Sequence, residues 1–128
     1  MAQGYARIGR DTYSTEIEVG GHQLTGDEPP RNGGRDAGPA PYDFLLAGLG
    51  SCTAITLRMY ADRKQWPLEA VRVDLHLTRN DEGTAIARTL HLTGALDADQ
   101  VARLADIAER TPVTLTLKAG ARIDTTVA

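Results

Sequence analysis

A long run without charge in the middle of the chain most constrains how the protein can fold. From Phe44 to Leu57 every residue is apolar or small, and none is Asp, Glu, Lys or Arg. Pro41 suits the first position of a helix, and Pro67 blocks helical continuation, so we predict a helix over residues 41–64. A surface helix normally shows one apolar stripe, whereas this one has no polar face. We therefore predict a helix that is enclosed on every side.

Complete enclosure of this helix requires more cover than a chain of 128 residues readily supplies. One small sheet covers one side of a helix, so the simplest completion is a second copy related by two-fold symmetry. Alternatively, a second helix and a loop of the same chain complete the burial in a monomer. The absence of a polar face favours the homodimer. Gly48 and Gly50 fit close approach of another backbone, because each costs about 1 kcal/mol relative to alanine inside a helix.

Alternation of apolar and polar residues predicts strands on both sides of the helix. The turn signal Asn-Asp-Glu-Gly at 80–83 joins two of these strands into a hairpin. Three short strands before the helix suggest an antiparallel unit. The predicted strands cover residues 7–10, 12–19, 22–25, 71–78, 86–93 and 122–127.

A second helix is predicted from a capping box in which Asp97 is the N-cap and Gln100 follows three residues later. Its helical spacing extends to about residue 110. The segment after Pro112 fits two structures, because its leucines alternate as in a strand while Thr111 and Pro112 resemble an N-cap and a first helical residue. The order predicts an α+β protein with a single domain over residues 1–128.

The segment 26–41 is dense in glycine, proline, asparagine and aspartate and shows no periodicity. Long loops in small domains are usually functional or disordered. This loop leads directly into the most apolar helix, so we expect it to be ordered against the site.

Charge and composition exclude several classes of function. The formal net charge is −3, and the 14 basic residues are scattered with no run longer than Arg63-Lys64, which argues against a surface for nucleic acid or anionic membranes. We expect no stretch that approaches the ~20 apolar residues of a membrane span, and the N-terminus lacks the apolar core of a signal peptide. One cysteine cannot form an intrachain disulfide, so we expect a cytoplasmic protein.

His76 and His91 lack supporting metal ligands and are expected to face solvent.

Cys52 lies in the first half of the predicted helix. An unpaired cysteine is usually a small buried hydrophobe, because reactivity requires a stabilised thiolate. The adjacent Ser51 and Thr53 offer hydroxyl donors, and a guanidinium beside the sulfur would stabilise the thiolate and orient a peroxide. The arginines that precede the helix are Arg7, Arg10, Arg31 and Arg35.

The run from Gly33 to Thr53 resembles the OsmC-like family in its Gly-Arg-Asp-Ala-Gly-Pro-Ala-Pro loop and its Gly-Leu-Gly-Ser-Cys-Thr helix segment. Residues 56–69 and 104–113 are similar to the family as well, so the resemblance extends from about residue 22 to the end. The family includes osmotically inducible proteins and organic hydroperoxide resistance proteins. The resemblance implies a swapped homodimer whose mixed sheets enclose the central helices. It also favours a short helix after Pro112.

The resemblance further implies thiol peroxidase chemistry. In active members a first cysteine, matched here by Cys52, attacks the peroxide and becomes a sulfenic acid. A second cysteine then resolves it as a disulfide that a dithiol reductant reopens. That second position is Thr111 in this chain, and threonine has no sulfur, so the two-cysteine cycle is impossible within the chain.

Two further positions of the family's site depart from the pattern or match it weakly. The acidic partner that usually follows the helix-starting proline falls at Tyr42, and Asp43 is the next residue. The peroxide-orienting arginine lies in an early Gly-Arg-Asp segment, which is similar to residues 9–11 and makes Arg10 the candidate.

The sequence thus leaves three functions open. The first is a one-cysteine thiol peroxidase of a stress response, which reduces organic hydroperoxides with an external thiol as resolving agent. The second is a non-catalytic dimer that binds a small apolar ligand, and the third is a structural protein without small-molecule chemistry. We predict no metal and no cofactor. The predicted catalytic residues are Cys52, Arg10 and Asp43, and the predicted substrate-binding residues are Arg35, Tyr42, Ser51 and Thr111.

Overall fold

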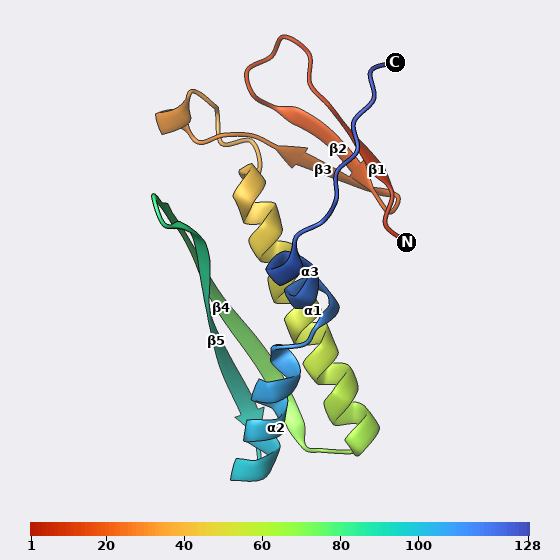
Figure 1. Cartoon of the computed structure of the whole chain (residues 1–128), viewed down its shortest axis with the longest axis vertical. Helices are drawn as coiled ribbons and strands as arrows, with labels where there is room; N and C mark the ends of the chain where they lie inside the picture. Colours follow the sequence, from red (N-terminus) through yellow and green to blue (C-terminus); the bar gives the residue numbers. More distant parts are fainter. The chain divides into compact units, whose positions relative to one another are not determined.

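The computed structural model describes all residues from Met1 to Ala128. The chain forms two compact units, residues 1–45 and 46–128, and Figure 1 shows the elements in the order β1-β2-β3-α1-β4-β5-α2-α3. A short 3-10 helix, Pro30–Asn32, lies in the loop before α1. The predicted α+β class is confirmed, whereas the single domain stays a prediction.

The first unit contains the antiparallel sheet β1-β2-β3, formed by Gly4–Arg7, Thr15–Val19 and His22–Gly26. Ala6, Ile17 and Leu24 lie side by side across the three strands and set the register. The first strand therefore precedes the predicted 7–10, because residues 4–7 are the ones that pair with 16–19. The second strand likewise begins at Thr15 rather than at residue 12.

A buried aspartate holds the loop between β3 and α1 in one conformation. The carboxylate of Asp27 accepts hydrogen bonds from the backbone N–H groups of Glu28 at 2.7 Å, Arg35 at 3.3 Å and Ala37 at 3.1 Å. These donors, Ala37 foremost, hold the pKa of Asp27 below its usual value. The loop is therefore ordered, and its order comes from hydrogen bonds to the carboxylate of Asp27 within the loop itself.

The loop carboxylate makes the stability of the first unit pH-dependent. Because the pKa of Asp27 is lowered on folding, its ionised form stabilises the fold above the unfolded pKa, and this contribution is lost as pH falls through the folded pKa. We expect Asp27→Asn to unfold at lower urea than the wild type at neutral pH, and the two midpoints to converge as pH falls below the usual aspartate pKa of about 3.9. Asp81→Asn in the exposed hairpin turn is the control, and a wild-type advantage that persists unchanged at low pH would contradict the assignment.

The helix α1 spans Pro41–Lys64, as predicted. Four residues at a spacing of four, Leu49, Thr53, Leu57 and Ala61, form its buried face. On other faces Ile55 and Met59 are 53% and 60% exposed. A single chain thus encloses α1 on one side only, and complete enclosure stays a prediction.

By length and composition alone, α1 is apolar enough to cross a membrane. This corrects the expectation that no segment approaches that length, because its glycine, serine and threonine residues lower the apolarity only slightly. The core helix of a globular protein passes the same test. The residues of α1 that pack in the second unit, Leu57 and Ala61, form a core cluster with Leu68, Leu104 and Ala108.

The second unit is built on the hairpin of β4, Leu68–Asn80, and β5, Gly83–Gly94. Figure 1 shows its long antiparallel strands in green. Val71 pairs with Leu92 and Val73 with Leu90, so the apolar side chains share one face. The predicted hairpin is confirmed, and both strands extend beyond the predicted bounds.

Two C-terminal helices follow the hairpin. In α2, Ala98–Ala108, the predicted capping box is present, since Asp97 and Gln100 each accept a hydrogen bond from the other's backbone N–H. The ambiguous segment forms α3, Pro112–Ala119, and Thr111 caps its N-terminus. The strand alternative for this segment is therefore wrong, because the cap and the proline start a helix.

The predicted final strand at 122–127 is also wrong for the single chain. Residues 120–128 form no regular element, and Ile123 and Val127 are exposed. A strand requires a hydrogen-bonded neighbour, and no strand of this chain pairs with the segment.

Candidate functional site

The lone thiol lies on α1 beside the buried face of that helix. Cys52 is half-buried and forms no disulfide. The neighbouring hydroxyls are both engaged by backbone carbonyls of the preceding turn, since Ser51 Oγ donates to Gly48 at 3.2 Å and Thr53 Oγ1 donates to Leu49 at 2.7 Å. Such bonds are typical of serine and threonine inside helices. Neither hydroxyl is therefore free to serve as the donor that the sequence suggested for the sulfur.

A residue that the sequence analysis did not select, Arg88, lies next to the thiol-bearing turn. Arg88 extends from β5, and its side chain is only 13% exposed. Its Nη1 donates to Thr53 Oγ1 at 3.0 Å and to Thr114 Oγ1 at 2.9 Å, and its Nη2 donates to the carbonyl of Ala108 at 2.9 Å. One guanidinium therefore ties α1 to the end of α2 and to α3. The sequence carried a signal for it, because Arg88 falls on the apolar side of the strand alternation with Ile86 and Leu90.

The position that the family resemblance assigns to a second thiol is part of the same network. Thr111 is completely buried, and its Oγ1 lies 2.6 Å from Thr114 Oγ1. It also accepts a hydrogen bond from the backbone N–H of Thr114 as the cap of α3. A continuous hydrogen-bond chain thus runs from Thr53 through Arg88 and Thr114 to Thr111. No buried side-chain N or O atom in the chain lacks a partner.

The acid closest to this guanidinium is Glu109. Its carboxylate lies 3.7 Å from Arg88 Nη2 and 2.8 Å from Lys118 Nζ. The hydrogen bond and charge of Lys118, with a smaller contribution from Arg88, lower the pKa of Glu109. Because Glu109 is largely exposed, neutral oxygens supply most of the compensation for the buried charge of Arg88.

Four predicted site residues lie in the first unit. Arg10 lies in an exposed bend after β1 and forms no ion pair within the chain. Arg35 donates to Asp11 through an exposed 2.7 Å ion pair. Asp43 Oδ2 accepts a hydrogen bond from the backbone N–H of Ala40 at 2.9 Å, which stabilises the start of α1. The fourth residue, Tyr42, is partly exposed.

The predicted residues thus divide between the two units. The first unit contains Arg10, Arg35, Tyr42 and Asp43, and the second contains Ser51, Cys52 and Thr111. Within the second unit, hydrogen bonds link Thr111 to the residue that follows Cys52. Both predicted solvent-facing histidines, His76 and His91, are exposed. No group of three or more His, Cys, Asp or Glu residues in the chain is placed to hold a metal ion.

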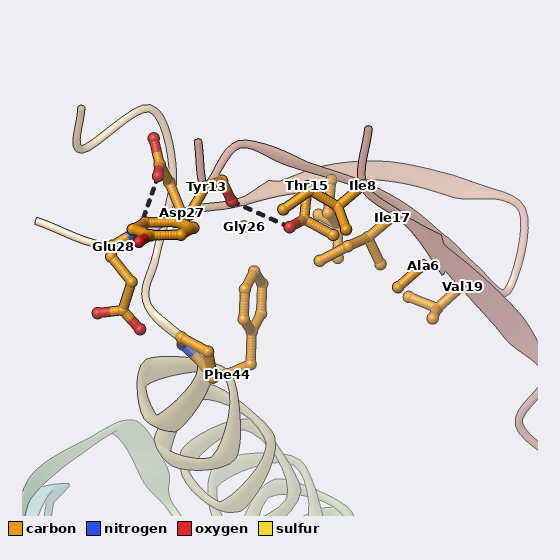
Figure 2. Close-up of a pocket in the computed structure, with 12 residues that line it drawn as sticks. Ala6, Ile8, Tyr13, Thr15, Ile17, Val19, Gly26, Asp27, Glu28 and Phe44 are labelled. Carbon is orange, nitrogen blue, oxygen red and sulfur yellow. Dashed lines mark hydrogen bonds between the residues drawn. The ribbon is translucent and has the colours of Figure 1, made fainter. Parts of the chain in front are cut away.

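An apolar cavity of about 750 Å³ lies against the sheet of the first unit. Figure 2 shows the ring of Phe44 pointing from the start of α1 towards Ile17 of the sheet, with Ile8, which follows β1, close to Ile17. Asp27 and Glu28 lie at the edge of the cavity. The other residues that line it are Ala6, Tyr13, Thr15, Val19, Leu24, Gly26 and Pro41.

Comparison with known proteins now identifies the family. The model of the family described as OsmC-like protein matches residues 33–126. The chain belongs to the OsmC-like family. No curated protein matches the sequence. The matched range contains both the thiol-bearing helix and the Arg88 network, and it leaves the whole β1-β2-β3 sheet outside.

Solved structures of this family share the fold of this OsmC-like protein. An OsmC-like protein from Mycoplasma pneumoniae has a TM-score of 0.79 and 20% identity, over 92% of this chain and 87% of that one. An organic hydroperoxide resistance protein OsmC from Legionella pneumophila has a TM-score of 0.66 and 22% identity, over 92% and 89%. The organic hydroperoxide resistance protein OhrB of Bacillus subtilis has a TM-score of 0.61 and 22% identity, over 91% and 90%. These likenesses confirm the α+β fold with a long central helix, and the swapped homodimer that the resemblance implied stays a prediction.

The buried guanidinium makes a testable contribution to stability. Arg88→Met keeps much of the side-chain volume but removes three hydrogen bonds that join separate elements. We expect a loss of about 2–4 kcal/mol in the free energy of unfolding, measured by urea denaturation. Arg72→Met removes an exposed ion pair of β4 and should cost less than about 1 kcal/mol. Equal stability of the two variants would exclude a structural role for Arg88.

Proposed function

We propose that this OsmC-like protein reduces organic hydroperoxides through Cys52 as a single-thiol peroxidase of a stress response. The observation that carries the proposal is a half-buried, unpaired thiol at the centre of the family's helix. Two solved structures with the same fold bear the name organic hydroperoxide resistance protein. Thr111, at the place where a resolving thiol would lie, is engaged as a helix cap.

The proposed cycle needs one protein sulfur and two equivalents of an external thiol. The Cys52 thiolate attacks the terminal peroxide oxygen, the O–O bond breaks, and the alkoxide leaves as an alcohol after protonation. Cys52 is then a sulfenic acid. An external thiol displaces water to form a mixed disulfide, and a second one releases Cys52 as the other product, a disulfide of the external thiol, forms. A reducing compartment, the cytoplasm, would supply these thiols.

The hydrogen bonds and ion pairs of the polar residues indicate which of them are available for catalysis. Arg10 has no ion-pair partner within the chain, so its guanidinium is available to orient a peroxide, whereas Arg35 is already paired with Asp11. Asp43 caps the start of α1 and would support the helix more than the reaction. We assign the catalytic roles to Cys52 and Arg10, and keep substrate contacts for Arg35, Tyr42 and Ser51.

The thiol mechanism predicts that activity depends on Cys52. We expect stopped-flow consumption of cumene hydroperoxide, in the presence of a small dithiol, to disappear in Cys52→Ser. Removal of a covalent nucleophile should lower the rate by at least about 1,000-fold. After a brief peroxide pulse with dimedone, mass spectrometry should find the adduct on Cys52. Thr111→Ser keeps the capping hydroxyl and is the matched control that should retain activity; an equal rate for Cys52→Ser would refute the mechanism.

We also propose that the active form is a homodimer whose second copy covers α1. The proposal is supported by the exposed apolar side chains Ile55 and Met59 on α1. The unpaired tail with Ile123 and Val127 exposes further apolar surface. Exposed apolar surface of this kind is typical of an interface.

The dimer predicts a change of mass when charge enters that face. We expect the wild type to sediment as a dimer and Ile55→Asp to sediment as a monomer, because a buried unpaired carboxylate opposes association. Val101→Asp, at a comparably exposed residue of α2, should remain a dimer. A monomeric wild type at micromolar concentration would refute the proposal.

The apolar cavity of the first unit favours a second candidate function, the binding of a small apolar ligand. Its walls are mostly aliphatic and aromatic, with Asp27 and Glu28 at one edge, which is the composition expected of such sites. A thermal-shift screen with fatty acids should then raise the melting temperature of the wild type and not that of Ile17→Asp. Absence of any stabilisation by apolar ligands would refute this second candidate function.

A further inference from the structure

A cluster of cations surrounds one phenol near the C-terminal end of α1. Tyr60 accepts a hydrogen bond from Arg103 Nε at 2.9 Å, and the Arg103 guanidinium carbon lies 5.7 Å from the centre of its ring. Lys64 Nζ lies 5.8 Å from the same centre. Trp66 packs edge-on against Tyr60 at 5.5 Å, which fixes the ring in place.

The charges of this cluster are not balanced. Arg103 donates to Asp106 at 3.1 Å, and Arg110 donates to the same carboxylate through a fork of 2.8 and 2.9 Å. Lys64 has no ion-pair partner in the chain, and the nearby acid of α1, Asp62, is paired with Arg58. The three cations Lys64, Arg103 and Arg110 thus lie around Tyr60 with one carboxylate, Asp106, which only the two arginines contact. The cluster keeps an excess of two positive charges.

The remaining donors of the cluster are held in position and accessible. Asp106 holds two guanidinium groups together, yet the side chains of Arg103 and Arg110 are 50% and 49% exposed. Each arginine has five N–H donors, so several stay available beyond the bonds to Asp106 and Tyr60. The Tyr60 hydroxyl accepts from Arg103 and therefore still has its own proton to donate. Arg103, Lys64 and Arg110 also lower the pKa of Tyr60, which makes it a stronger donor to an anion.

We propose that Tyr60, Lys64, Arg103 and Arg110 form a binding site for a phosphate group carried by a small molecule. A phosphate monoester has three terminal oxygens and nearly two negative charges at neutral pH, which matches the excess of two positive charges and the several donors around Tyr60. Because these donors surround one ring instead of forming a row, they suit a compact anion more than an extended acidic chain. The site is distinct from Cys52 and does not depend on the peroxide chemistry.

Isothermal titration calorimetry with inorganic phosphate and pyrophosphate tests this site at about 150 mM NaCl, where long-range attraction is screened. We expect saturable binding at one site per chain. Lys64→Gln breaks no ion pair and should weaken binding about 10-fold, because it removes one charge-assisted contact. Tyr60→Phe keeps the ring, loses the donor and should also weaken binding. Arg122→Gln lowers the net charge equally in the C-terminal tail and should bind like the wild type.

Three results would overturn the proposal. The first is the absence of saturable binding by both phosphate probes when circular dichroism shows the protein folded. The second is an equal loss of phosphate affinity in Lys64→Gln and Arg122→Gln, which would indicate that the anion is attracted to any positive charge on the protein. The third is binding of a poly-glutamate peptide with no binding of pyrophosphate, which would indicate a surface for an acidic protein.

Discussion

The structure depends on how a long uncharged helix is covered. The buried residues of α1 lie at a spacing of four from Leu49 to Ala61, and Leu57 and Ala61 pack against apolar residues of β4 and α2. The remaining faces of α1 carry no charge from Phe44 to Leu57, yet the single chain leaves Ile55 and Met59 exposed. Apolar surface of this extent is costly in water.

The second unit combines this apolar packing with one buried charge. Arg88 joins three elements through bonds to two threonine hydroxyls and one carbonyl, and every buried polar side-chain atom has a partner. A buried charge is tolerated only when its donors are satisfied. The threonines at 53, 111 and 114 are therefore specific requirements of this arrangement, since each supplies a small buried hydroxyl at a junction between helices. In this chain the network holds the segment after α2 against the thiol-bearing helix without a second sulfur.

This arrangement frames the functional question for an OsmC-like protein with one thiol. A protein that forms an internal disulfide must bring two sulfurs together and separate them again. In this chain the position of the second sulfur is Thr111, which caps α3. A redox cycle of Cys52 would therefore need a thiol from outside the chain. The phosphate site proposed at Tyr60 lies at a different part of the second unit and uses different chemistry. It would give the protein a second ligand independent of its redox state.

The sequence alone determined the local elements and the family. The uncharged run, the capping box at Asp97 and the alternation of β4 predict their structures because helix starts, caps and strand periodicity are set by neighbours along the chain. Where a segment needed a distant partner, the sequence was insufficient. Pairing with β2 decided that the first strand is residues 4–7, and the lack of a partner left 122–127 without a strand.

The candidate site likewise contains residues that the sequence identified and one that only the tertiary structure revealed. Cys52 and Thr111 were identifiable from the family pattern, but Arg88 emerged only when β5, α1 and α3 came together. In the sequence, Arg88 interrupts the apolar side of an alternating strand pattern. The fold shows that the oxygens of two threonines and one carbonyl accept its hydrogen bonds. Tertiary structure alone could decide this, because the compensation of a buried charge comes from atoms that lie 20 to 35 residues away in the sequence.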